Sequence, residues 1–173
     1  ITYTLTDPSG EQDTGTLTVT VGTNTAPTGA DNVLTLNEDG SHTFTANDFG
    51  FADDDAAQSL NGVRIDTLPV AGTFTLGGVA VTAGQIIPVA SLGTLVFTPA
   101  TNANGNNYAN FTFSVQDSAG GFDLTPNTIQ LNVTALNDAP DATNDIATTA
   151  INTAVVIDVR ANDSDIDNAQ TDL

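Results

Sequence analysis

The chain has 173 residues and a formal net charge of −19, because 21 Asp and Glu residues face only 2 basic ones, Arg64 and Arg160. It contains no Cys, which excludes thiol catalysis, zinc–thiolate sites and disulfides. Two arginines are too few for the phosphate contacts of nucleic-acid binding. No apolar run reaches the length of about 18 residues needed to span a membrane. We therefore expect a polyanion that is not an enzyme, binds no nucleic acid and does not insert into membranes.

Apolar and polar residues alternate in several short segments, which is typical of half-buried β-strands. In chain order the alternating apolar positions are Ile1/Tyr3/Leu5, Leu17/Val19/Val21, Phe111/Phe113/Val115 and Ile129/Leu131/Val133. Gly77-Gly78 between segments 73–76 and 79–82 predicts a β-hairpin. Asp39-Gly40 predicts a turn between segments 33–36 and 43–46. No segment has helical periodicity over three turns, so the predicted fold class is all-β.

Parts of the sequence recur after about 113 residues, a length that fits one antiparallel sandwich domain. The matching segments are 1–10 with 111–120, 24–27 with 137–140, and 46–48 with 161–163. We interpret residues 1–25 as the C-terminal strands of a preceding repeat, 26–138 as a complete repeat and 139–173 as the N-terminal strands of a following repeat. Neither end segment has enough strands for a core of its own. The end strands therefore suggest the hypothesis of pairing with other copies by strand complementation.

Carboxylates lie mainly at the ends of the repeats rather than along the strands, and they are most closely spaced in two loops. One is Asp163-Ser-Asp165-Ile-Asp167, and the other is Asp53-Asp54-Asp55. Closely spaced Asp side chains supply the oxygen ligands that calcium prefers. Neighbouring carboxylates also repel one another unless a divalent cation lies between them, and the chain has no Lys to offset them. The simpler interpretation is a solvated acidic turn, and we favour calcium at both loops.

A series of short motifs, taken in order, resembles a known group of proteins. The motifs are Phe97-Thr-Pro99, Asn104-Gly105, Phe111-Thr-Phe113-Ser-Val115-Gln-Asp117, Gly120-Gly121, Leu136-Asn137-Asp138-Ala139-Pro140 and Ala161-Asn162-Asp163-Ser164-Asp165. Through them the chain resembles the cadherin-like and bacterial Ig-like tandem repeats of large secreted surface adhesins, including those of the RTX type. The resemblance implies an antiparallel Ig/cadherin-like β-sandwich on the bacterial cell surface, with calcium joining consecutive repeats.

The same resemblance implies two calcium sites, one at each junction between repeats. The downstream junction takes ligands from Glu38, Asn137, Asp138, Asp163 and Asp165, with Asp167 as a local alternative. The upstream junction uses Asn24, Asp53, Asp55 and Asp117. Thr25 stands where the downstream junction has Asp138, so we expect the downstream site to bind calcium more tightly.

The resulting prediction is a non-catalytic, calcium-binding tandem repeat that extends and rigidifies a large extracellular adhesin. Its partners are the neighbouring repeats of the same chain. Two alternatives remain open. One is a self-associating structural subunit of an extracellular fibre or sheath, joined through its end strands. The other is an adhesion domain that binds a sugar or a host protein, which requires exposed aromatic side chains, yet aromatics make up only 6% of the chain.

Overall fold

A computed structural model describes residues 1–20, 22–169 and 172. Within them the chain forms strands β1 (Thr2–Thr6), β2 (Gln12–Thr16), β3 (Asn32–Asn37), β4 (His42–Thr43), β5 (Leu60–Ile65), β6 (Thr73–Leu76), β7 (Val79–Ala80), β8 (Ile86–Pro88), β9 (Leu95–Thr98), β10 (Gly105–Asp117) and β11 (Asn127–Thr134), with 3₁₀ helices η1 (Ala46–Phe49) and η2 (Val89–Thr94). The structure is mostly β, as predicted. None of the described helices is long and apolar enough to cross a membrane.

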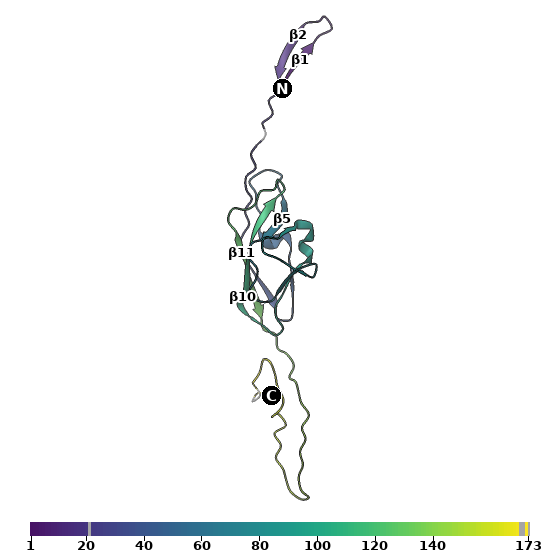
Figure 1. Cartoon of the computed structure of the whole chain (residues 1–173), viewed down its shortest axis with the longest axis vertical. Helices are drawn as coiled ribbons and strands as arrows, with labels where there is room; N and C mark the ends of the chain where they lie inside the picture. The colour runs from purple at the N-terminus through teal and green to yellow at the C-terminus, as the bar shows by residue number, and fades with distance from the viewer. Residues whose placement is uncertain (21, 170–171, 173) are drawn as a thin grey trace.

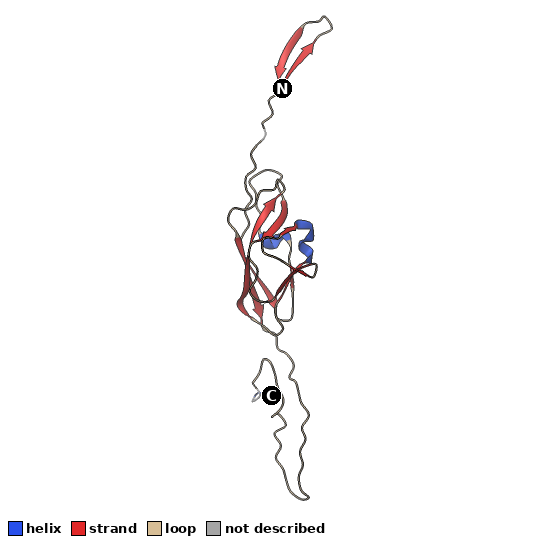
Figure 2. Ribbon diagram, in the orientation of Figure 1, coloured by secondary structure: helices blue, strands red, loops and turns tan. Residues whose placement is uncertain are grey.

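Two sheets pack face to face in the central unit as an Ig-like sandwich (Figure 2). One sheet has the strand order β3-β11-β10-β5-β8, and the other has the order β4-β9-β6-β7. Strands β1 and β2 form a separate hairpin beyond one end of this unit, while the segment after β11 extends from the opposite end (Figure 1). Entry and exit of the chain therefore lie at opposite ends of the sandwich.

The predicted antiparallel sandwich contains one parallel pair of strands. β3 and β11 run parallel, with Leu34 opposite Leu131 and Asn37 opposite Thr134, whereas the other paired strands are antiparallel. The reason is the path of the chain: the first and last strands of the central unit lie side by side and both lead away from the entry end (Figure 1). Because these two strands run in the same direction, the chain passes from one end of the unit to the other.

Aromatic rings from both sheets fill the core. Phe111 of β10 lies against Phe74 of β6 and against Phe44, with ring centroids 4.8 and 5.6 Å away. The alternating residues predicted for β10 and β11 face this core, and Phe113 and Leu131 are 0% exposed. The period-two pattern thus identified the buried face of the longest strands correctly.

The two predicted turns form, with one difference. Gly77-Gly78 connects β6 and β7 as a hairpin in which Leu76 pairs with Val79. At Asp39-Gly40 the amide of Gly40 donates to Asn37 O (3.2 Å), but β3 and β4 belong to different sheets. The strand predicted over 43–46 ends at Thr43. The Asp48 carboxylate accepts the Thr45 amide (2.7 Å) and so caps the N-terminus of η1, which begins at Ala46.

The strands predicted in the end segments are largely missing. β2 ends at Thr16, so residues 17–20 are not a strand, and Val21 lies outside the described residues. From residue 139 to 169 the structure contains no strand beyond an isolated bridge between Asp141 and Ser164. Apolar side chains there are open to solvent; Ile146 is 94% exposed and Val156 is 97% exposed. Among the described residues they have no second sheet to pack on, and a half-buried strand needs one.

Gly72 permits close packing behind β9, and its substitution gives a testable result. Both Gly72 (φ +76°) and Gly78 (φ +81°) adopt a left-handed backbone, which costs a non-glycine residue about 1–2 kcal/mol. A Cβ at Gly72 would also lie 2.7 Å from Phe97 Cζ, whereas at Gly78 it meets open space. We expect Gly72→Ala to lower the free energy of unfolding by about 2–4 kcal/mol and Gly78→Ala by about 1 kcal/mol, as measured by urea denaturation. Equal losses would contradict the packing argument.

Candidate metal centre

Glu38 is the buried carboxylate at the exit end of the sandwich. It follows β3 directly and is only 2% exposed. Because β3 runs beside β11, Glu38 lies next to the linker that follows β11, and its two oxygens accept hydrogen bonds from Asn104 Nδ2 (2.8 Å) and from the Leu136 amide (2.6 Å). These bonds, that of Asn104 first, lower the pKa of Glu38. Glu38 is therefore held as a carboxylate, facing the linker.

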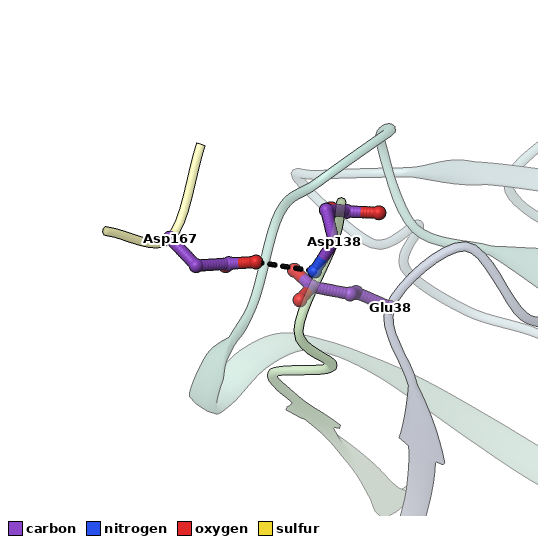
Figure 3. A group of neighbouring side chains, drawn as sticks. All are labelled: Glu38, Asp138 and Asp167. Atoms are coloured by element: carbon purple, nitrogen blue, oxygen red, sulfur yellow. Dashed lines mark hydrogen bonds between the residues drawn. The ribbon is translucent and has the colours of Figure 1, made fainter. Parts of the chain in front are cut away.

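Two further carboxylates meet Glu38 from different parts of the chain. Asp138 comes from the linker and Asp167 from the C-terminal segment, and Asp167 Oδ2 accepts the Asp138 amide (2.6 Å) (Figure 3). One carboxylate oxygen of each of the three residues lies within 4.8 Å of those of the other two. We call Glu38, Asp138 and Asp167 the acidic triad.

Asp138 is the residue of the triad whose environment disfavours its charge. Burial raises the pKa of Asp138, and the negative charges of Asp167, Asp39 and Glu38 raise it further. Its Oδ2 is buried and has no hydrogen-bond partner among the described residues. Buried carboxylate oxygens are normally paired, so this one needs a partner. The donor set fits a hard divalent cation such as calcium, which prefers carboxylate oxygens and would offset the repulsion.

The other predicted downstream ligands lie around the triad with different contacts. Asp165 Oδ1 accepts the amides of Asp167 (2.8 Å) and Asn168 (2.9 Å), which shapes the loop that carries Asp167. Asn137 Nδ2 donates to Asp138 O (2.7 Å). Asp163 Oδ1 accepts the Thr143 amide (2.7 Å). Asp167, expected only as a local alternative, thus joins the triad, whereas Asp163 and Asp165 hold the backbone around it.

Comparison with known proteins places this sandwich in a family. A family model described as bacterial Ig domain matches residues 24–134. The chain belongs to this family. A search of curated proteins finds no match. Bacterial Ig domains are generally non-catalytic and typical of surface proteins.

The predicted upstream ligands gather at the entry end of the Ig domain. Asn24 Nδ2 donates to Asp117 Oδ2 (2.9 Å), and Asp55 Oδ2 accepts the Thr25 amide (2.6 Å). Asp117 is fully buried; burial acts to raise its pKa, but hydrogen bonds from Asn24 and from the Gly121 amide outweigh this and lower it. Asp53 Oδ2 is buried without a hydrogen-bond partner among the described residues.

The hydrogen bonds at the two ends of the Ig domain repeat each other. The Thr25 amide donates to Asp55 Oδ2 at the same 2.6 Å as the Asp138 amide to Asp167 Oδ2. The Asp55 amide donates to Asp53 Oδ1 at 2.8 Å, as the Asp167 amide does to Asp165 Oδ1. The bridges Thr28–Ala52 and Asp141–Ser164 also correspond. The loop that carries Asp165 and Asp167 is therefore a structural counterpart of the Asp53–Asp55 loop.

The sequence did not indicate the hydrogen bonds that two residues make at the ends of the Ig domain. Asp123, only 8% exposed, accepts the amides of Gly29 (2.7 Å) and Thr125 (2.9 Å) and so fixes the entry linker to the Ig domain. Asn104 anchors Glu38. The available signal for Asp123 was weak: it lies two residues before Thr125, the spacing of an Asx turn.

Proposed function

We propose that this chain is a connecting segment of a bacterial surface protein, in which calcium rigidifies the junctions between consecutive Ig domains. The acidic triad carries the proposal, because Glu38 belongs to the Ig domain, Asp138 to the linker and Asp167 to the segment that follows. A cation bound to all three would tie these parts together. The domain itself needs no catalytic group for this role, and its partners are the neighbouring domains of the same protein.

The path of the chain supports a role as a spacer. Because β3 and β11 are parallel neighbours, the chain enters at one end of the Ig domain and leaves at the other (Figure 1). Domains joined in this way extend in a line. The recurrence of the same hydrogen bonds about 113 residues apart supports a tandem arrangement, with a related junction at each end.

Charge supports calcium as the stabilising ion. A net charge of −19 destabilises the compact folded state by self-repulsion, and each bound calcium ion cancels two negative charges. Extracellular calcium modules have dissociation constants of roughly 10⁻⁴–10⁻³ M. Free calcium at about 100 times the dissociation constant stabilises the bound state by roughly 2.7 kcal/mol per site. Our proposal therefore includes an extracellular, calcium-rich location, such as that of RTX-type adhesins.

Asp138→Asn provides the decisive test, because its effect should change sign with calcium. The pKa of Asp138 is raised, so its ionisation destabilises the folded chain as pH rises above the usual Asp value of 3.8. In EDTA at pH 7 the neutral amide should raise Tm by a few degrees. In 10 mM calcium the wild type should be the more stable of the two, by on the order of 5–10 °C. Thermal melts of both proteins under both conditions measure this crossover.

Asp145→Asn is the matched control, because it makes the same change of charge in the exposed C-terminal segment, outside the triad. Its Tm should equal that of the wild type in EDTA and in calcium. In a second control, magnesium should raise the Tm of the wild type much less than calcium does. If Asp138→Asn keeps the full calcium response, the triad is not the site. If the wild type shows no response to calcium, the proposal fails.

A further inference from the structure

One stretch of the Ig domain contains no charged residue, in contrast to the rest of the chain. From Thr67 to Gln116 the sequence has no Asp, Glu, Lys, Arg or His, although the whole chain has 21 acidic residues. This stretch contains β6, β7, β8, η2 and β9 and most of β10. The acid that precedes it, Asp66, is paired with Arg64. We call the surface formed by the 67–72 loop, β6, β7, β8 and η2 the neutral flank. The Arg64–Asp66 ion pair borders it, since Arg64 of β5 lies opposite Ile86 of β8.

The neutral flank exposes apolar side chains. Val70 is 92% exposed and Val79 is 71% exposed, and Ile86 and Val89 are partly exposed nearby in sequence. Beside β7 lies a groove of about 390 Å³ whose walls include Leu68, Phe74 and Val81. Helix η2 lies at the side of the central unit, away from both extended ends (Figure 2). The surface combines projecting apolar groups with an apolar hollow.

β7 is also an edge strand, because among the strands that the structure describes it pairs with β6 alone. Edge strands are commonly protected by charged residues or proline, and Val79–Ala80 has neither. The strand is only two residues long, so it offers little backbone for a continued ladder. Contact at this flank should therefore be made by side chains.

From this we propose that the neutral flank is a lateral contact surface for a second copy of the same chain. Two copies with a charge of −19 repel each other where acidic surfaces meet, whereas a flank without charge permits close approach. A two-fold contact brings the same patch of both copies face to face, so the projecting valines of each copy would meet the groove of the other. The contact would join parallel or antiparallel Ig domains side by side and does not depend on the end strands.

Sedimentation equilibrium of the full chain from 0.05 to 1 mM tests this contact. The buffer contains EDTA and 0.5 M NaCl, so that the remaining repulsion is screened and the result is independent of calcium and of the proposed function. We expect a reversible dimer. Val79→Asp should weaken it at least tenfold, because it introduces a carboxylate into each half of the contact. Val70→Asp, at the more exposed position, gives a second variant that leaves the packed core untouched.

Val33→Asp is the matched control, since Val33 is 57% exposed on β3, the edge strand of the other sheet. It should change the dissociation constant less than twofold. Far-UV circular dichroism and Tm confirm that each variant is folded. The proposal is overturned if the wild type stays monomeric at 1 mM. It is equally overturned if the dimer tolerates both Val79→Asp and Val70→Asp, which would assign the contact to another surface such as the end segments.

Discussion

Phe111→Ala is expected to lower the free energy of unfolding by about 3–5 kcal/mol, much of the 5–15 kcal/mol typical of a domain. Phe111 is 0% exposed and joins the two sheets, because its ring on β10 packs against Phe74 of β6 and Phe44 beyond β4. Its removal leaves a cavity between rigid sheets that cannot close easily. Urea denaturation followed by far-UV circular dichroism gives the value directly.

Tyr3→Ala is the control for this loss. Tyr3 also lies on an alternating strand, β1, but its side chain is half exposed and the hairpin stands apart from the sandwich core. Its removal should cost less than about 0.5 kcal/mol. A loss below 1 kcal/mol for Phe111→Ala would mean that the aromatic cluster is not the centre of the core.

Alternation predicted the strands of the sandwich well where a partner sheet exists. Phe111/Phe113/Val115 and Ile129/Leu131/Val133 all point into the core, because side chains of a strand alternate between its two faces. The same pattern at Leu17 and Val19 gives no strand. A period of two shows which face is apolar, but it contains no information on whether another sheet lies there to cover it.

Other features of the fold depend on contacts between distant residues. The parallel pairing of β3 with β11 joins residues almost a hundred positions apart, such as Leu34 and Leu131. No local signal specifies it. The strand predicted over 43–46 ends early and η1 begins at Ala46, because a single carboxylate, that of Asp48, accepts the amide of Thr45. A local hydrogen bond of this kind outweighs the preference of Thr and Phe for strands.

The closeness of three carboxylates at the exit end was predicted in part, whereas cation binding there stays a prediction. Resemblance to repeats joined by calcium named Glu38, Asp138 and Asp167 among the ligands of one junction, and the structure brings their carboxylates together. It could not rank Asp167 above Asp163 and Asp165, because all three lie on one alternating loop. The three carboxylates differ in the backbone amides from which they accept hydrogen bonds, and these hydrogen bonds exist only in the folded chain.

Glu38→Gln is expected to lower Tm by about 5 °C in EDTA at pH 7 and to remove most of the calcium response. One oxygen of Glu38 accepts the Leu136 amide and the other accepts Asn104 Nδ2. A neutral Gln accepts the Leu136 amide more weakly than a carboxylate does, and its NH2 group can pair with Asn104 only after the Asn104 amide turns to present Oδ1. The substitution thus loosens the linker and takes one carboxylate from the acidic triad. Thermal melts with and without calcium measure both effects.

The pH dependence in EDTA identifies the carboxylate as the cause. The pKa of Glu38 is lowered in the folded chain, so its contribution is fully present above the usual Glu value of 4.5 and is lost as pH falls through the folded pKa. The Tm difference between wild type and Glu38→Gln should therefore be constant near neutral pH and shrink in acid. Glu11→Gln, at the other Glu of the chain, is the control, because Glu11 is exposed in the loop before β2. It should give the same melts as the wild type. If the Tm difference between wild type and Glu38→Gln persists unchanged below pH 4, the effect comes from packing. The proposal that the charged Glu38 carboxylate holds the linker would then be wrong.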